Sequence, residues 1–118
     1  MLAQAASQTA ERLRIGLDLD IVPDVRLSTT RAEALVRVAC EAITNAAKHS
    51  GAARVTLRLE RDGSRVRMQV ADRGRGFDTS DPRAGFGLVS MRERIRSVGG
   101  ELHINSGPGR GSEVDVAV

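Results

Sequence analysis

The sequence predicts a two-layer α/β sandwich, in which three helices cover one face of a five-stranded, mostly antiparallel mixed sheet. Two kinds of apolar spacing predict it. Three segments repeat apolar residues every three or four positions, as amphipathic helices do, and five short segments alternate apolar and polar residues, as half-buried strands do. Because the strands alternate, one face of the sheet is expected to be solvated and the other to carry the helices.

The first helix and the first strand are predicted from the N-terminal part of the chain. Residues 2–14 place apolar side chains every three or four positions, the spacing of an amphipathic helix. Residues 15–21 alternate apolar side chains with glycine and aspartate, the period of a half-buried strand. Pro23 is expected to end that strand, because proline lacks the backbone donor that a strand uses.

A second, longer helix is expected to begin at Thr30 and to close near Gly51. Residues 30–33 (Thr-Arg-Ala-Glu) match a capping box, in which a hydroxyl and a carboxylate satisfy free backbone donors reciprocally. Gly51 suits the left-handed conformation that often closes a helix. The apolar stripe of this helix is Ala32, Leu35, Val36, Ala39, Ile43, Ala46 and Ala47. A polar stripe with similar spacing is Arg37, Glu41, Asn45 and Lys48.

Four further strands and a third helix are predicted downstream. Two strands, joined by the Asp-Gly turn at residues 62–63, have as their inward residues Val55, Leu57 and Leu59, then Val66, Met68 and Val70. The third helix follows the glycine-rich residues 73–87, closes at residues 99–100, and carries Leu88, Met91, Ile95 and Val98. The last two strands flank the turn at residues 107–111 and carry Leu102 and Ile104, then Val114, Val116 and Val118.

Cysteine content and hydropathy indicate the compartment. The single cysteine, Cys40, excludes an internal disulfide and a zinc cluster of several thiolates, which fits a reducing environment. No apolar run approaches the roughly 18 residues of a membrane helix. The first residues lack the basic start and apolar stretch of a signal peptide. We therefore expect a cytoplasmic chain that makes no membrane contact.

Charge and aromatic content narrow the class of ligand. The chain has 17 arginines, one lysine and a formal charge of +3, so a nucleic acid or a small polyanion could bind. Its only aromatic residues are Phe77 and Phe86. Single-stranded nucleic acids usually need aromatic side chains on which bases stack. This composition argues against nucleic acid and leaves the small polyanion.

The period of two places a carboxylate on the apolar face of a strand. Asp72 is in phase with Val70, so its side chain is expected to point towards the helices, and Ser112 is in phase with Val114. An ionised group on an apolar face is costly unless it is paired or hydrogen-bonded. Alternatively, Asp72 lies just past the strand and caps the following turn.

Glycines follow Asp72 at places where a ligand could approach the backbone. Gly74 and Gly76 allow close approach of a flat ligand and a positive φ. Residues 85–87 (Gly-Phe-Gly) precede a helix, whose free N–H groups favour an anion such as phosphate. Each pattern is also common in ordinary turns. The sequence matches neither a Walker loop nor a Rossmann fingerprint, so those nucleotide folds are excluded.

The polar stripe of the second helix could bind a metal and phosphates. Asn45 offers a neutral oxygen of the kind that Mg²⁺ accepts together with phosphates and water. Glu41, one turn earlier, could hold a metal-bound water, and Lys48 and His49, one turn later, could meet phosphate oxygens. The alternative is that this stripe is simply the solvated face of a surface helix.

Together these segments resemble the ATP-binding boxes of the GHKL superfamily, which includes histidine kinases, gyrase, Hsp90 chaperones and MutL repair ATPases. The boxes are residues 41–49 (EAITNAAKH), 72–77 (DRGRGF), 85–94 (GFGLVSMRER) and, at the end, 109–112 (GRGS). The resemblance covers about residues 15–118 and implies the Bergerat ATP-binding fold. Residues 44–49 and 87–94 are most similar to the nitrate-sensor and DesK-like sensor histidine kinases.

The resemblance assigns one group of residues to the nucleoside. Asp72 would accept a hydrogen bond from the adenine amino group, and Ser112 would join that contact. Gly74 and Gly76 would line the base and ribose, and Phe77 belongs to the same box. The last box usually carries threonine where this chain has Ser112; the hydroxyl is retained, so binding is expected to be retained too.

A second group of residues is assigned to the phosphates. Asn45 would hold Mg²⁺, and Lys48 and His49 would meet phosphate oxygens. Glu41 matches the general base of the hydrolysing members; in a kinase it is expected only to position groups around the metal. The lid exit and the phosphate-facing start of the third helix would be formed by Gly85, Gly87 and Leu88.

The resemblance implies a kinase domain that binds Mg-ATP but does not phosphorylate itself. His49 belongs to an ATP box, and His103 is expected on the outer face of the sheet. The γ-phosphoryl group would pass to a histidine on a separate dimerisation domain, and from there to a response regulator. Residues 1–14 are expected to be the end of the linker helix from that domain, and residues 15–118 the catalytic domain. The alternatives are an anti-sigma-factor serine kinase of the same fold and a non-enzymatic basic interaction module.

Overall fold

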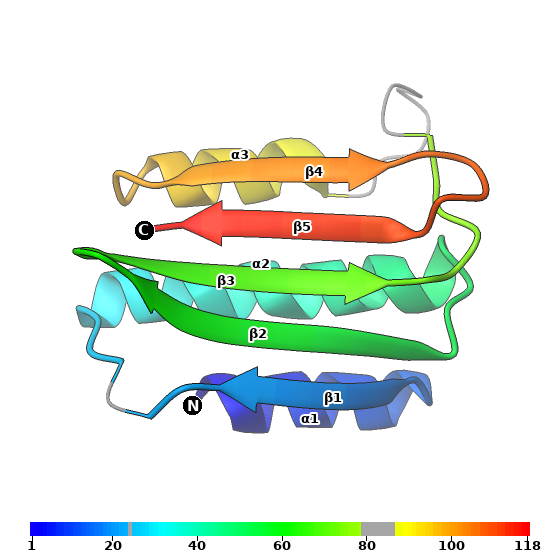
Figure 1. The fold of residues 1–118 in the computed structure, drawn as a ribbon, viewed down its shortest axis with the longest axis horizontal. Helices are drawn as coiled ribbons and strands as arrows, with labels where there is room; N and C mark the ends of the chain where they lie inside the picture. Colours follow the sequence, from blue (N-terminus) through cyan, green and yellow to red (C-terminus); the bar gives the residue numbers. More distant parts are fainter. Residues whose placement is uncertain (24, 79–86) are drawn as a thin grey trace.

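The computed structural model describes residues 1–23, 25–78 and 87–118, and within them it has the predicted three helices and five strands. All three helices lie behind one face of the sheet, which confirms the two-layer architecture (Figure 1). The elements are α1 (Leu2–Leu13), β1 (Gly16–Ile21), α2 (Thr29–Lys48), β2 (Arg54–Asp62), β3 (Arg65–Asp72), α3 (Leu88–Arg96), β4 (Glu101–Ser106) and β5 (Ser112–Ala117).

The strand order, β1-β2-β3-β5-β4, decides which strand ends become neighbours. β1 runs parallel to β2, and all other pairs are antiparallel, so the sheet is mixed. The register places Asp72, at the end of β3, beside Val55 on β2 and Ser112 on β5. Residues that are 40 positions apart in the sequence thereby meet at one end of the sheet.

The hydrophobic core lies between the sheet and α2, which has α1 on one side and α3 on the other (Figure 1). Leu57 and Met68 from the sheet and Ile43 from α2 are fully buried there. Because α2 has neighbours on both sides, its buried surface is wider than the predicted apolar stripe. It also includes Ala34, Val38 and Ala42.

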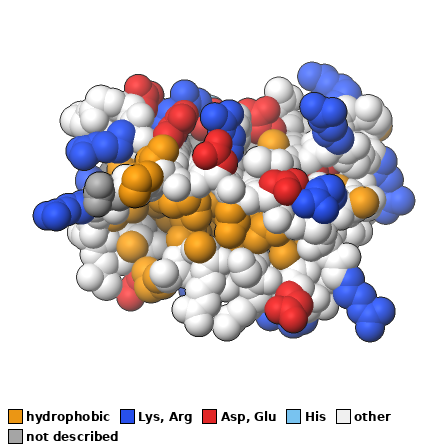
Figure 2. Space-filling view, turned by 60° about the horizontal axis from the view of Figure 1, so that its bottom comes forward, with side chains coloured by type: hydrophobic (Ala, Val, Ile, Leu, Met, Phe, Trp, Pro, Cys, Tyr) orange, Lys and Arg blue, Asp and Glu red, His pale blue; other side chains and the backbone are white. Residues whose placement is uncertain are grey.

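The edge strand β1 leaves part of its apolar face uncovered. Leu19 remains 42% exposed, although Leu17 and Ile21 pack partly against the core. Figure 2, turned towards the edge formed by α1 and β1, shows apolar side chains in a band beneath charged ones. Among the described helices, none is both long enough and apolar enough to span a bilayer.

The start of α2 differs from the sequence prediction. Ser28 is the N-cap residue: its hydroxyl accepts the N–H of Arg31 at 3.3 Å, and its carbonyl accepts the N–H of Ala32 at 2.9 Å. The capping box predicted at Thr30 is therefore wrong, because Thr30 already lies within the first turn. Residues 28–30 present three hydroxyls in succession, and sequence spacing alone does not say which one caps.

The end of α2 is closed by a wider turn than predicted. The C-cap residue is His49, and Gly51, which has the predicted left-handed conformation (φ 63°), follows two residues later. The N–H of Ala52 then donates to the carbonyl of Ala46 at 3.0 Å. This turn carries Ser50 to the end of the sheet.

We expect replacement of Ser28 by alanine to lower the free energy of unfolding by about 1 kcal/mol, because the N–H of Arg31 loses its acceptor. Thr30→Ala is the matched control, and it should change stability much less. Urea unfolding of both variants measures the difference. A larger loss for Thr30→Ala would reinstate the cap at Thr30.

Candidate nucleotide-binding site

The predicted boxes meet at one end of the molecule. The end of β3, the start of β5, the end of α2 and the start of α3 all lie at the right-hand side of Figure 1. β3 and β5 are antiparallel, so the end of β3 lies beside the start of β5. Asp72 and Ser112 are therefore direct neighbours. The topology therefore assembles the site from segments spread over residues 41–112.

The carboxylate of Asp72 is held by three donors from three segments. Oδ1 accepts the Ser50 hydroxyl at 2.7 Å and the N–H of Gly74 at 2.8 Å. Oδ2 accepts the hydroxyl of Ser112. Asp72 belongs to β3 and points to the helix side, as its phase predicts, and it also bonds to the following turn. The inward direction is thus confirmed; of the alternative, the bond to the turn is present, but Asp72 lies within the strand and not past it.

Ser50 is the site residue that sequence reasoning missed. It is fully buried, and besides donating to Asp72 its hydroxyl accepts the N–H of Gly76 at 2.9 Å. Its carbonyl accepts the N–H of Arg75 at 2.7 Å. A serine just after a helix is typical of an ordinary helix end, so the sequence carries no signal for this role.

Gly74 and Gly76 are needed because protein segments approach each other here. A Cβ on Gly74 would lie 2.5 Å from the Ser50 hydroxyl oxygen. Gly76 has φ 71°, and a Cβ there would meet the carbonyl of Gly111 at 2.7 Å. Phe77 follows, is buried, and donates its N–H to the hydroxyl of Ser106 at 3.0 Å. The loop after Asp72 is therefore packed firmly against the turn before β5.

The polar stripe of α2 is only partly a solvated face. Asn45 is 3% exposed, and Glu41 is half-buried against the start of α3, where a Cβ on Gly87 would collide with its carboxylate. Arg37 and Lys48 are exposed, as a solvated face requires. Glu41, Arg37 and Gly87 contribute to a hollow of about 260 Å³ between α2 and α3. Two of the four polar residues, Glu41 and Asn45, are thus at least partly withdrawn from solvent.

The start of α3 has the geometry predicted for it. Gly87 is the N-cap residue with a left-handed φ of 71°, and Leu88 begins the helix and is half-buried. Free N–H groups at this end of the helix favour an anion. Gly85, the remaining predicted site residue in this segment, lies outside the described residues.

His49 has a shifted proton affinity. Burial lowers its pKa from the usual value of 6.5, the charge of Lys48 lowers it further, and Arg75 adds to this, whereas Glu41 opposes the shift. The shift favours the neutral imidazole, which has one N–H to donate.

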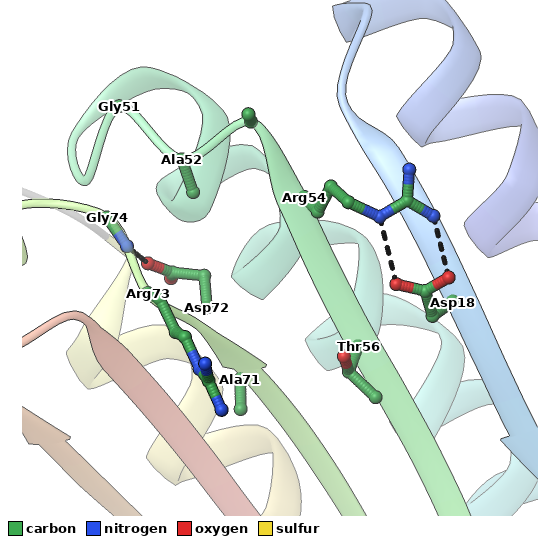
Figure 3. A pocket seen from close by; sticks show the side chains of 10 residues that line it. Asp18, Gly51, Ala52, Arg54, Thr56, Ala71, Asp72, Arg73 and Gly74 are labelled. Carbon is green, nitrogen blue, oxygen red and sulfur yellow. Dashed lines mark hydrogen bonds and ion pairs between the residues drawn. The ribbon is translucent and has the colours of Figure 1, made fainter.

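A hollow of about 680 Å³ lies close to Asp72 but opens on the solvated face of the sheet (Figure 3). Asp18, Arg54 and Thr56 line it, and each alternates with the inward residues of its strand. Asp72 and Gly74 border it at the strand end. It is therefore distinct from the helix side, to which the carboxylate of Asp72 points.

Ion pairs neutralise four arginines of the solvated face. Bonds of 2.6 to 3.7 Å join Arg54 to Asp18, Arg58 to Asp20, Arg67 to Asp115 and Arg65 to Glu101. The hydrogen bond donated by Arg54 lowers the pKa of the Asp18 carboxyl, so this pair stays charged at neutral pH. A nucleic acid would need free cations on such a face, so the pairing disfavours a basic interaction module.

Comparison with known proteins agrees with this geometry. A LiaS sensor histidine kinase from Bacillus subtilis is 32% identical over 118 residues, which cover 99% of this chain and 32% of LiaS. The sensor histidine kinase MctS from Rhizobium johnstonii is 40% identical over 100 residues, or 79% of this chain and 22% of MctS. The chain therefore spans about a third or less of the length of these curated relatives.

The histidine kinase domain of the blue-light activated kinase from Erythrobacter litoralis EL346 has the same fold. It superimposes with a TM-score of 0.84 at 25% identity, covering 99% of this chain and 58% of that one. The family described as histidine kinase-, DNA gyrase B- and HSP90-like ATPase matches residues 30–118, which contain all the boxes. The chain belongs to this family of ATP-binding domains.

Proposed function

We propose that this domain binds Mg-ATP and donates the γ-phosphoryl group to a histidine on a separate dimerisation domain of a two-component sensor kinase. From that histidine the phosphoryl group would pass to a response regulator. The observation that carries the proposal is the inward-facing Asp72 carboxylate, held between Ser50, Gly74 and Ser112 in a chain of this family. The named relatives are sensor histidine kinases, which favours this function over an anti-sigma-factor serine kinase.

The domain division and subfamily belong to the same proposal. Residues 15–118 form the catalytic domain, and residues 1–14 are the end of the linker helix, although Ala6 and Ala10 are buried against the common core. The motifs at residues 44–49 and 87–94 support membership of the nitrate-sensor and DesK-like group. A cytoplasmic location follows from the need for ATP.

The free hydrogen-bonding positions near Asp72 favour adenine over guanine. A carboxylate has about four acceptor positions, and three donors occupy two on Oδ1 and one on Oδ2. Among the described residues, no further donor reaches the carboxylate, so one position on Oδ2 remains. The hydroxyl of Ser112 has given its only proton to Asp72, so towards a ligand it also acts as an acceptor. The 6-amino group of adenine is a donor that matches these acceptors, whereas the 6-carbonyl of guanine is not.

The residues at the other end of the site fit a magnesium ion shared with phosphates. Among the residues that the structure describes, no cluster of three His, Cys, Asp or Glu could cage a metal by itself. The amide oxygen of Asn45 could supply one ligand, and Mg²⁺ commonly takes few protein ligands beside phosphates and water. When bound, the ion would neutralise charge on the β- and γ-phosphates.

The remaining residues of the site would align the phosphates. Lys48 is an exposed cation next to His49, whose lowered pKa favours the neutral imidazole, and both side chains can donate to phosphate oxygens. Gly87 and Leu88 present the start of α3. Glu41 would orient groups around the metal, so that catalysis consists mainly of positioning and charge neutralisation.

The acceptor histidine must come from elsewhere in the kinase. His49 is part of the site itself, and His103 is exposed on β4, opposite Asp115 on the solvated face of the sheet. Leu102 and Ile104, its neighbours, point to the core. His103 therefore faces away from the inward carboxylate of Asp72.

Saturating Mg-ATP should raise the unfolding temperature of the domain by several degrees, because a ligand at a hundred times its dissociation constant stabilises by about 2.7 kcal/mol. Mg-GTP should raise it little, and Asp72→Asn should abolish the response to ATP, since the amide replaces an acceptor by a donor. Each protein is compared with its own unliganded unfolding curve. An unchanged ATP response in folded Asp72→Asn would exclude the assigned role.

Removing the amide oxygen of Asn45 should abolish the gain in ATP affinity that Mg²⁺ provides, a loss of about tenfold or 1.4 kcal/mol. Isothermal titration of Asn45→Ala with ATP, with Mg²⁺ and with EDTA, measures this gain. Asp72→Asn is the contrasting variant, because it should weaken binding under both conditions. Equal losses with and without metal in Asn45→Ala would remove Asn45 from the metal site.

Binding of ATP should raise the pKa of His49, because nearby phosphate oxygens favour the protonated imidazole. An NMR titration of the imidazole C2–H resonance between pH 4 and 9 (roughly two units on either side of the ordinary value) follows the change. The resonance of His103, on the other face, should not respond to nucleotide. An unmoved His49 titration would place the phosphates away from it.

A further inference from the structure

We propose that Ser50 is a positioning residue that sets the orientation of the Asp72 carboxylate and thereby the selectivity for the 6-amino group of the purine. The proposal rests on the adenine site described above. Neither the four ATP boxes nor the family relationship assigns a role to Ser50, which lies one residue beyond the box that ends at His49.

Ser50 bonds simultaneously to both segments that build the nucleoside end of the site. Its hydroxyl donates to Asp72 Oδ1 at 2.7 Å and accepts from Gly76 N–H at 2.9 Å. Its carbonyl accepts from Arg75 N–H at 2.7 Å. Because a hydroxyl has a single proton, the bond with Gly76 leaves Asp72 as the acceptor of that proton.

The surroundings of Ser50 leave its side chain little freedom. It is fully buried, and Gly74 packs so closely that a Cβ there would lie 2.5 Å from the serine hydroxyl oxygen. Its own N–H donates to the carbonyl of Asn45 at 3.0 Å. Ser50 therefore ties the carboxylate to the last turn of α2, where the proposed metal ligand Asn45 lies.

The orientation of the carboxylate depends on its hydrogen bonds, because the χ2 torsion of an aspartate is only weakly restricted. This terminal torsion is broad and roughly two-fold, so the surrounding donors set it. Ser112 holds Oδ2, and Gly74 and Ser50 share Oδ1. On Oδ1, Gly74 donates from the loop that follows Asp72 itself, whereas Ser50 donates from a different element. Without Ser50, Oδ1 has a vacant acceptor position that water or the ligand can occupy. The single free position on Oδ2 then no longer defines how the base docks.

The test compares two ligands that differ only in the 6-amino group: ATP and purine riboside 5′-triphosphate. Titration calorimetry gives the dissociation constant of purine riboside 5′-triphosphate divided by that of ATP. This ratio is measured for the native domain, Ser50→Ala and Ser50→Thr. We expect Ser50→Ala to reduce the ratio about tenfold, since a hydrogen bond to a charged group contributes about that much. Ser50→Thr keeps the hydroxyl and should restore the ratio. Ser97→Ala, at an exposed serine, is the matched control.

The ratio separates positioning from a purely structural role. A structural defect weakens both triphosphates by the same factor and leaves the ratio unchanged, and that result overturns the proposal. Where Ser50→Ala does not fold, Ser50→Cys replaces the hydroxyl by a weaker donor, and its ratio must then fall below that of the native domain; an unchanged ratio overturns the proposal. A native domain that binds both ligands equally would instead overturn the adenine site itself.

Discussion

A carboxylate on the apolar side of the sheet is the constraint on which this end of the molecule depends. Asp72 ends β3 facing the helices, where an unpaired charge would be costly. Ser50, Gly74 and Ser112 satisfy it from the end of α2, the following loop and β5. The three donors come from segments that only the sheet topology brings together. The requirement to bond one charge therefore fixes the geometry of three segments at once.

The same constraint explains the glycines on both sides of the sheet end. The loop after Asp72 must pass close enough to bond with Ser50, and the turn before β5 must pack on that loop: Gly109 N–H donates to the carbonyl of Arg75 at 2.5 Å. Gly76 and Gly111, both with positive φ, make room for these contacts. Glycines in a binding site are usually explained by close approach of the ligand. Here the contacts between backbone segments already require glycine, before any ligand is considered.

Sequence periodicity predicts the elements well and predicts the contacts between them less well. The three helices and five strands follow from apolar spacing, and the phase of Asp72 correctly indicates its inward direction. Local chemistry is ambiguous where equivalent groups are adjacent, which is why Ser28, and not Thr30, caps α2. The partners of a buried polar group depend on pairing between distant strands, such as β3 with β5, and no local pattern encodes that pairing. Ser50 escapes prediction for this reason.

Stability and ligand recognition are coupled in this arrangement. Removing one partner from a buried polar group costs about 1–3 kcal/mol, so even part of that loss at half-buried Asp72 matters beside the roughly 5–15 kcal/mol that stabilises a domain. The bonds between Asp72 and its donors therefore stabilise the fold without a ligand. The remaining acceptor position on Oδ2 takes no part in those bonds. On the polar stripe of α2, Lys48 and Arg37 are exposed, so their side chains are less constrained than the carboxylate of Asp72. In the proposed site, the end that would bind the base is consequently preorganised by folding, whereas the exposed side chains that would meet the phosphates could adapt to the state of the transferred group.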